Sequence, residues 1–373
     1  MKKLFFIAAI AGAALVGCTK NELAPSVTEQ QEITFATPVV GTPTKVDLVS
    51  IYPDTQPFGV FALYYTANFN GFASGVNYMN NVEVANNAPA GEDPDGGWTA
   101  AGYYWPKTSG STLTFAAYSP YMSTGVSHSA TGITFTDYIV DASANVDLLF
   151  SDRAYNKTKA DQIGDTELND QYYGVDIVFN HALSAILFKA KAADKLVGHT
   201  DGTPNYEFVI TKIEVLNADS KGTFSQKLVD ATNGSTPETP EASTTDWTTS
   251  DNVNYTAYTG SGITVNSTTA TSAYGTDIAG KADLILLPQS LADVKVKVTY
   301  NLRHSNMEAG RYIAGNVAEA NLSYDPEGTA DDVTSWLRGK RYIYTLTLDL
   351  DQIYFSPEMT GWTDVTVAGS QIL

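Results

Sequence analysis

Two stretches of the chain alternate between apolar and polar residues, and this alternation constrains the fold more than any other feature. In residues 294–300 (VKVKVTY), valine or tyrosine takes every second position, with lysine and threonine between them. Residues 341–350 place tyrosine and leucine in one phase, and threonine and aspartate in the other. A period of two with one apolar face is typical of antiparallel sheets that have one face in water. The chain is therefore predicted to be all-β.

Other apolar runs are continuous rather than alternating. Residues 58–65 (FGVFALYY) and 113–118 (LTFAAY) have the length of a strand, and such runs are typical of strands buried on both faces. Residues 182–195 allow a helical interpretation, but a strand is favoured because they continue a strand-like run from Val175. Asn-Gly and Asp-Gly pairs recur between the runs and indicate turns.

At 373 residues the chain is longer than one hydrophobic core usually serves, so two domains are expected. Many short strands separated by turns favour β-sandwiches, here two in tandem. We place them at residues 33–173 and 174–373, divided after a polar, acidic stretch. Residues 231–281 are rich in serine and threonine, and are predicted to form a long surface excursion or a wide hairpin rather than core.

The charge balance and the cysteine count exclude several functions. The chain carries 22 Lys and Arg against 41 Asp and Glu, a formal net charge of -19. A surface this acidic repels phosphate backbones, so no nucleic-acid partner is expected. The single cysteine, Cys18, excludes a disulfide framework and a cysteine-based zinc site. We therefore expect no metal and no cofactor.

The N-terminus predicts a lipoprotein signal peptide over residues 1–17. Lys2 and Lys3 precede an apolar stretch too short to cross a bilayer, and Gly17 precedes Cys18. This ending resembles a bacterial lipobox, in which the cysteine becomes the acylated first residue. Cys18 is the predicted lipidation site, and residues 18–32 are predicted to be a flexible tether to the outer membrane. The alternative is an ordinary signal peptide with a chance cysteine.

No motif predicts catalysis. Residues 93–96 (DPDG) lack the further oxygen ligands and the closing glutamate of a calcium loop, and are predicted to form a turn. Residues 260–262 (GSG) lack the third glycine of a dinucleotide-binding motif. The four histidines lie far apart in sequence. His181, beside an apolar run, is expected to be a hydrogen-bonded structural residue.

The aromatic group Trp98, Tyr103, Tyr104 and Trp105 allows two interpretations. Exposed rings on a sheet could stack on sugars, whereas buried rings would fill a sandwich core. The core interpretation is favoured because Tyr104 and Trp105 precede Pro106 at a strand end.

Motifs spread along the chain resemble those of the fimbrillin family, the Mfa-like or type V pilins of Gram-negative anaerobes. They are GCTKNE at 17–22, ITF at 33–35, FGVFA at 58–62, YMNN at 78–81, YWP at 104–106, LTFAAYSP at 113–120, DLL at 147–149, VFNHALS at 178–184, LLPQ at 286–289 and GK at 339–340. The resemblance implies two tandem transthyretin-like Greek-key β-sandwich domains, a lipoprotein precursor and assembly into surface fimbriae. It does not distinguish a stalk, a tip or an anchor subunit.

One departure from the family concerns processing. In the best understood members an arginine-specific protease cuts after the first strand, but the first arginine of this chain is Arg153. Lys45 is the candidate processing site for a protease of broader specificity, unless the chain is never trimmed. Ile33 and Phe35 mark the candidate displaced strand, because a cut at Lys45 would free it without touching the core.

The candidate donor strand follows Trp362 near the C-terminus. Its apolar positions are Val365, Val367, Ile372 and Leu373. Asp364 and Thr366 take the phase opposite to the two valines. A strand donated to a neighbour's groove gains main-chain hydrogen bonds, and its alternate side chains set the register. A last strand paired within its own domain is the alternative.

The predicted function is that of a structural and adhesive subunit of a cell-surface fimbria, exported as a lipoprotein. The expected partners are other fimbrial subunits, the outer membrane and a host or bacterial surface ligand. The alternative is a lipid-anchored surface glycan-binding protein that does not polymerise. A glycosidase has less support, because no carboxylate pair can be singled out in the sequence.

Replacing Cys18 by alanine is expected to leave an unprocessed or released protein, because the thiol is the group that would carry the lipid. Cell fractionation and N-terminal sequencing measure both outcomes. A Cys18→Ala chain that still fractionates with the outer membrane and still loses residues 1–17 would contradict the lipoprotein interpretation.

Overall fold

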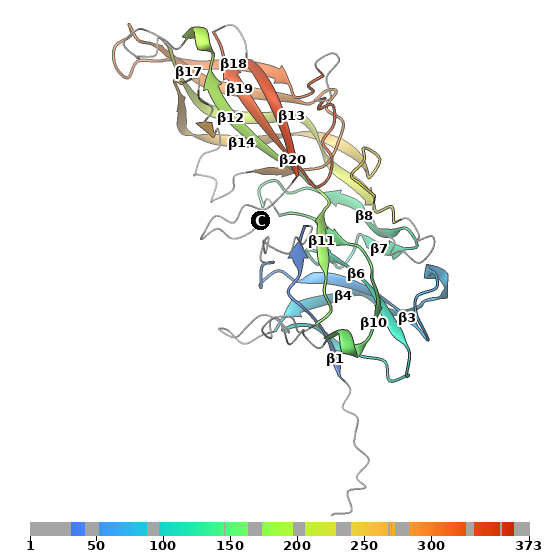
Figure 1. The fold of residues 1–373 in the computed structure, drawn as a ribbon. Coiled ribbons are helices and arrows are strands. Elements are labelled where there is room, and N and C mark those ends of the chain that lie inside the picture. Colours follow the sequence, from blue (N-terminus) through green and yellow to red (C-terminus); the bar gives the residue numbers. More distant parts are fainter. Residues whose placement is uncertain are drawn as a thin grey trace, which may run out of the picture. The chain divides into compact units, whose positions relative to one another are not determined.

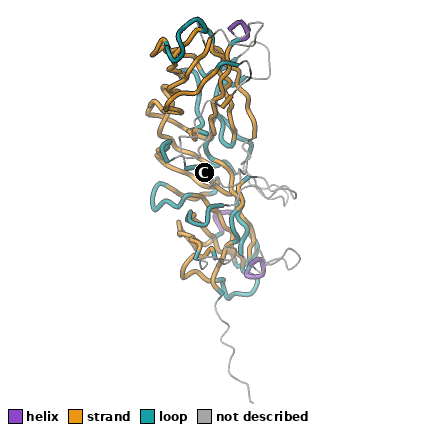
Figure 2. The backbone as a smooth tube through the Cα atoms, turned by 90° about the vertical axis from the view of Figure 1, so that its left-hand side faces the viewer, coloured by secondary structure: helices purple, strands orange, loops and turns teal. Residues whose placement is uncertain are grey.

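A computed structural model describes residues 31–41, 52–87, 97–144, 146–162, 174–196, 206–228, 240–267, 269, 271–272, 283–325, 332–350 and 353–361. Nearly all regular structure in this part of the chain is β-strand (Figure 2), which confirms the all-β prediction. The helices there are short 3₁₀ turns: η1 (Phe72–Ser74), η2 (Lys159–Gln162) and η3 (Asp194–Leu196). None of these described helices has the length and apolar character needed to cross a membrane. The tandem transthyretin-like Greek-key arrangement stays a prediction.

The first sheet contains nine of the described strands (Figure 1). They are β1 (Glu32–Phe35), β2 (Val39–Val40), β3 (Phe58–Tyr65), β4 (Val76–Asn86), β5 (Trp98–Tyr104), β6 (Thr112–Ser119), β9 (Leu149–Ser151), β10 (Ala154–Lys157) and β11 (Val178–His181). The strand order is β1-β5-β4-β3-β6-β9-β11-β2, and β10 pairs with β6. The first and last strands in this order, β1 and β2, are consecutive in sequence. One short N-terminal segment therefore supplies both.

The other two sheets form a β-sandwich. One contains β12 (Ser184–Ala192), β15 (Thr271–Ser272), β16 (Leu284–Leu286), β19 (Lys340–Leu348) and β20 (Ile353–Gly361). The other contains β7 (Val126–Ser129), β8 (Gly132–Ile139), β13 (Tyr206–Ser225), β14 (Trp247–Val265), β17 (Lys295–His304) and β18 (Ile313–Asn321). Phe188 of β12 and Tyr344 of β19 share one buried cluster with Ile213 of β13 and Val298 of β17. The two sheets therefore pack face to face around a common core.

Strands β3 and β6 are buried on both faces, as their continuous apolar runs predict. Val60 and Phe115 lie in the core of the first sheet. Phe61 and Tyr118, on the opposite faces of the same strands, belong to the core of the sandwich. Strands β3 and β6 are hydrogen-bonded neighbours. They therefore form one layer that lies between the two cores and contributes side chains to both.

The alternating and ambiguous stretches also form strands. The alternating stretches become β17 and β19, and their apolar phase is buried at Val296, Val298, Tyr342 and Tyr344. The stretch that allowed a helical interpretation forms β12, which pairs in parallel with β19. Both predictions of strands are confirmed.

The serine- and threonine-rich stretch is described only in part, and its assignment to a surface excursion or a wide hairpin stays a prediction. Its residues 247–265 form β14, which pairs antiparallel with β13 and so makes one arm of a long hairpin. Trp247 and Tyr258 are buried in the sandwich core, while most other side chains of β14 are exposed or half-buried. A strand with few buried positions needs few apolar residues, and β-branched threonine suits its exposed face.

Two sets of pairings cross the predicted division between residues 173 and 174. The hairpin of β7 and β8 pairs with β13, through β8. Strand β11 pairs with β9 and, in parallel, with β2. The division into residues 33–173 and 174–373 stays a prediction, and the strands are hydrogen-bonded across it.

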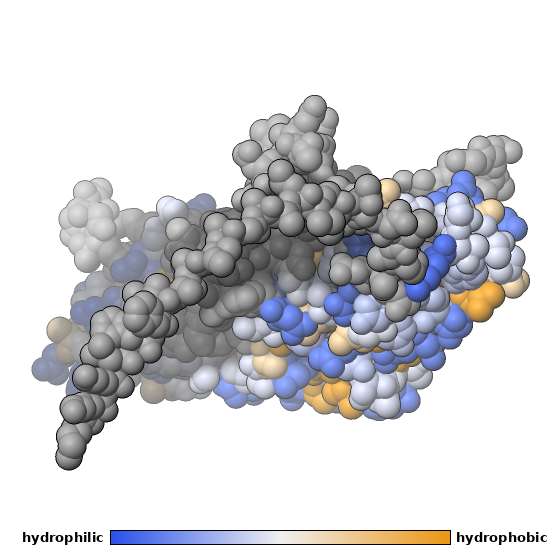
Figure 3. All heavy atoms as spheres, turned by 90° about the horizontal axis from the view of Figure 1, so that it is seen from below, coloured by the Kyte–Doolittle hydropathy of each residue, from blue (hydrophilic) through white to orange (hydrophobic). Residues whose placement is uncertain are grey.

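The described part of the face in Figure 3 is mostly hydrophilic, with small and separate apolar patches. Exposed apolar side chains lie on different strands, among them Val76, Ile139, Val253 and Ile313. Scattered apolar residues of this kind are normal on a protein surface.

Replacing Phe115 by alanine is expected to lower the free energy of unfolding by about 3–5 kcal/mol, because its ring is fully buried and leaves a cavity. Val76→Ala is the control, since that side chain is 62% exposed and its loss should cost less than about 0.5 kcal/mol. Urea denaturation measures both. Equal losses in the two variants would contradict the assignment of Phe115 to the core.

Candidate strand-exchange site

Residues 31–41, which we call the closing segment, are hydrogen-bonded on two sides. The first half is β1, which pairs antiparallel with β5 so that Phe35 lies opposite Trp98. The second half runs parallel to residues 175–179. The backbone bonds there are Ala36 N–H to Val175 O at 3.2 Å, Val39 N–H to Ile177 O at 3.1 Å, Gly41 N–H to Phe179 O at 2.8 Å, and Val175 N–H to Thr34 O at 2.9 Å. The closing segment thus fills the gap between β5 and residues 175–179.

The closing segment also supplies side chains to the core of the first sheet. Ile33 and Phe35 are fully buried, and Val40 is nearly so. The Phe35 ring meets Phe58 and Phe115 edge to face, at centroid distances of 5.7 and 5.5 Å. Burial of three apolar side chains stabilises the segment, each by about 1.5–3 kcal/mol. Loss of the closing segment would leave a groove lined by the apolar side chains that now pack against it.

Two polar contacts add to the attachment. The indole Nε1 of Trp98 donates a hydrogen bond to Thr37 Oγ1 at 3.2 Å. The backbone N–H of Gly102 donates to Glu32 Oε1 at 3.3 Å. The backbone bonds on both sides and the buried apolar side chains therefore carry most of the attachment.

Gly174 lets residues 175–179 approach the closing segment. Its φ is +144°, and a Cβ at this position would lie 2.1 Å from the carbonyl carbon of Phe35 and 2.3 Å from the nitrogen of Ala36. No side chain fits there, because both obstacles are backbone atoms. The sequence does not predict this contact, since its only signal there is a glycine followed by the alternating apolar residues Val175, Ile177 and Phe179.

After the closing segment the described chain resumes at Tyr52, which is buried in the same core. Its ring lies 5.4 Å from the Trp98 ring and 5.6 Å from the Phe179 ring. Its hydroxyl shares a 2.5 Å hydrogen bond with Ser119 Oγ. Burial raises the pKa of Tyr52, so the phenol stays protonated and can donate this bond. Lys45 therefore lies between two anchored points, Gly41 and Tyr52.

The structure describes only some of the predicted site residues. Ile33 and Phe35 lie in β1 at the centre of the site. The others lie outside the described residues: Cys18, Lys45, Val365, Val367, Ile372 and Leu373.

His181 is a hydrogen-bonded structural residue, as predicted. It lies on β11, and its Nδ1 is 2.5 Å from Asp147 Oδ2, with both side chains buried. Within the described ranges, no group of three or more His, Cys, Asp and Glu side chains comes together in a way that could hold a metal ion.

The aromatic group near β5 fills the core at its two tryptophans. Trp98 is fully buried and Trp105 is nearly so, which confirms the core interpretation for both. Tyr104 is 37% exposed, and Tyr103 contacts the neighbouring Tyr78 at a centroid distance of 6.3 Å.

The fold and the site define an all-β protein whose first sheet is completed by a short N-terminal segment. The family model described as fimbrillin-like matches residues 46–362. The chain therefore belongs to the fimbrillin-like family, which confirms the predicted resemblance and the prediction of a fimbrial protein of the cell surface. No curated protein matches it in sequence.

Solved structures of fimbrial and cell adhesion proteins are similar to this chain at low sequence identity. A fimbrial protein from Bacteroides vulgatus is 18% identical, with a TM-score of 0.51, covering 89% of this chain and 100% of its own. A candidate cell adhesion protein from Bacteroides uniformis is 17% identical, with a TM-score of 0.48, covering 90% and 97%. The C-terminally truncated tip fimbrial protein Mfa3 from Porphyromonas gingivalis is 11% identical, with a TM-score of 0.34, covering 82% and 95%.

Replacing Gly174 by alanine is expected to loosen the closing segment, because the new Cβ would overlap the backbone of Phe35 and Ala36. Hydrogen exchange should then be faster at the amides of residues 34–36 than in the parent chain. Gly71→Ala is the matched control, since Gly71 also has positive φ but nothing lies within 4 Å of its added Cβ. Equal exchange in both variants would show that Gly174 does not seat the segment.

Proposed function

We propose that this chain is a surface-anchored fimbrial subunit that joins its neighbours by exchanging β-strands. In this proposal the closing segment leaves after cleavage at Lys45, and the C-terminal segment of another subunit takes its place. The precursor is tethered to the outer membrane through lipid on Cys18. Membership in the fimbrillin-like family supports the fimbrial role, and favours a structural function over a catalytic one.

One observation carries the proposal: the closing segment is bonded to β5 on one side and to residues 175–179 on the other. Its removal would leave two backbone edges unpaired, with the buried groups that now pack on Ile33 and Phe35 between them. Unpaired edges beside an apolar groove recruit an added strand, because main-chain hydrogen bonds and alternate side-chain pockets are both available.

The position of Lys45 suits such a release. Among the described residues, the closing segment makes its last backbone hydrogen bond at Gly41, and the described chain resumes at the buried Tyr52. A cut between these two points leaves every strand from β3 onward intact. It also separates the closing segment from the core chain, so that dissociation is no longer held back by a covalent link.

The proposed donor strand has the complementary pattern. Val365 and Val367 share one phase, which would face the groove, and Asp364 and Thr366 would face outward. Ile372 and Leu373 extend the apolar set after a Gly-Ser interruption.

The test compares two C-terminal double variants in chains allowed to assemble. Val365→Asn with Val367→Asn should reduce the heat-resistant ladders on gels at least about tenfold, because each buried valine contributes about 1.5–3 kcal/mol. Asp364→Asn with Thr366→Asn is the matched control in the opposite phase, and should assemble as the parent does. Equal ladders from both pairs, and from a chain lacking residues 363–373, would exclude this donor.

A second comparison tests the processing step. Lys45→Ala should keep the closing segment and block assembly, whereas Lys107→Ala, at an exposed lysine on the surface, should not. N-terminal sequencing of the assembled chains locates the cut. Normal ladders from Lys45→Ala would show that release does not depend on this residue. Absence of ladders from the trimmed parent chain would make it a tip, an anchor or a solitary lipoprotein.

A further inference from the structure

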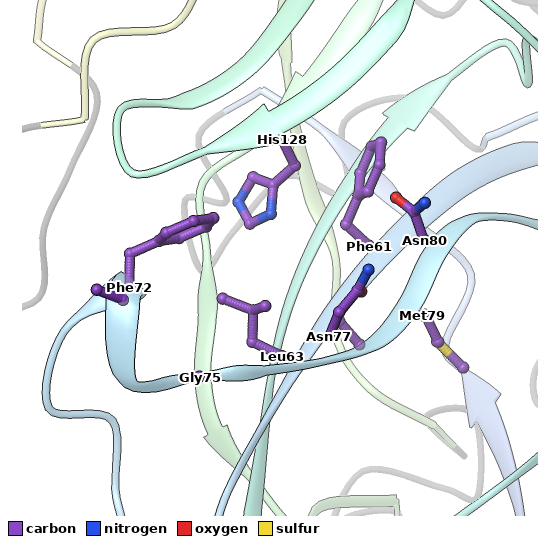
Figure 4. Close-up of a pocket in the computed structure, with 10 residues that line it drawn as sticks. Phe61, Leu63, Phe72, Gly75, Asn77, Met79, Asn80 and His128 are labelled. Atoms are coloured by element: carbon purple, nitrogen blue, oxygen red, sulfur yellow. The ribbon is translucent and has the colours of Figure 1, made fainter.

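A pocket of about 310 Å³ opens between β3, η1, β4 and β7, away from the closing segment (Figure 4). Most of its lining comes from the consecutive elements β3, η1 and β4, and the more distant β7 adds His128. Small-molecule sites usually measure about 300–1,000 Å³. This pocket is therefore large enough for a single ring-sized group and too small for an extended chain.

One part of the wall is apolar and aromatic. Phe61 and Leu63 of β3 and Phe72 of η1 line the pocket. The His128 ring projects between the two phenylalanines, with centroid distances of 5.5 Å to Phe61 and 5.3 Å to Phe72 (Figure 4). Such a wall packs well against a flat face of C–H groups.

Another part of the wall is polar but uncharged. Asn77 and Asn80 of β4 line the pocket and are exposed. Neither amide makes a hydrogen bond to another described residue, so each retains two N–H donors and a carbonyl acceptor. The register between β3 and β4 shifts between Val60 and Leu63, and this irregularity lets Met79 and Asn80 line the same pocket although they are consecutive.

His128 adds a third polar group, and its contact with Arg153 determines which ring nitrogen carries the proton. Arg153 Nε donates to His128 Nε2 at 3.1 Å, so the neutral ring must carry its proton on Nδ1. Burial, and then the Arg153 charge, lower the pKa of His128 to about 3, so the ring is neutral at physiological pH. Arg153 itself is buried, and donates further bonds to the carbonyls of Ser129 and Ala130.

These groups define the ligand. The described residues that line the pocket include no Asp, Glu, Lys or Arg, so a charged ligand would lose hydration without a charged side chain to contact in the lining. A purely aromatic or aliphatic ligand would cover the amides without using them, which is unfavourable for the same reason. A pyranose ring has a face of C–H groups and hydroxyls that both donate and accept. It therefore matches the aromatic wall and the two amides together.

We propose that this pocket binds one neutral pyranose unit of a glycan. Phe72, which is half-buried, packs against the ring, and Asn77, Asn80 and His128 Nδ1 hydrogen-bond its hydroxyls. The site contains no residue of the closing segment, so it would work before and after strand exchange. It would make the subunit adhesive independently of its assembly.

Saturation-transfer NMR on the purified chain tests the proposal with three probes: methyl α-D-glucopyranoside, methyl α-D-mannopyranoside and methyl β-D-galactopyranoside. At least one should bind. Asn77→Ala and Asn80→Ala should each weaken its binding about fivefold, since one lost hydrogen bond is worth about 1 kcal/mol. Both side chains are exposed, so folding should be unaffected. Asn306→Ala is the matched control, at an exposed asparagine after β17, and should bind as the parent does.

Two further probes distinguish other ligands. N-acetylneuraminic acid, which is charged, should bind more weakly than the neutral glycosides. N-acetyl-L-tyrosinamide stands for an aromatic side chain of a peptide. Binding of this amide without any glycoside, binding of no glycoside at all, or equal weakening by Asn306→Ala and Asn77→Ala would each overturn the proposal.

Discussion

Burial of β3 and β6 on both faces is the constraint on which the rest of the structure depends. Val60 and Phe115 pack into the core of the first sheet, while Phe61 and Tyr118 pack into the sandwich core. A layer buried on both sides needs apolar residues at successive positions, which is why these strands read as continuous runs. A one-residue change in their register would move side chains from one core into the other.

The closing segment completes the first sheet through contacts that another strand could replace. It contributes Ile33 and Phe35 to the core, and its covalent link to the later strands runs through residues 42–51. The contacts that hold it are backbone hydrogen bonds and buried apolar side chains, and another strand with the same alternation could reproduce both. Because Gly174 has no Cβ, the backbone of the closing segment can lie against it, whereas a side chain at this position would overlap that backbone. This combination of a buried strand and a replaceable backbone is what strand exchange requires.

The pocket and the closing segment lie on different parts of the first sheet. The closing segment contacts β5 and residues 175–179, whereas the pocket uses β3, β4 and η1 with β7 across from them. Strand β7 is the outer strand of a hairpin that also pairs with β13 of the sandwich. The sandwich thus positions His128 above the first sheet, and recognition would depend on both cores being intact.

The sequence by itself determined the strand content and much of the burial. Alternation located β17 and β19, continuous runs located β3 and β6, and the surroundings of His181 predicted a structural role. These features are local, since a strand's pattern reports which of its own faces are buried.

Pairing partners are not local, and only the tertiary structure decided them. It joined the β7–β8 hairpin to β13, placed residues 175–179 beside the closing segment, and made a strand of the serine- and threonine-rich β14. The pocket could not be predicted from the sequence for the same reason. Its aromatic, amide and imidazole groups come from separate strands, and a register shift in one strand pair brings Asn80 among them.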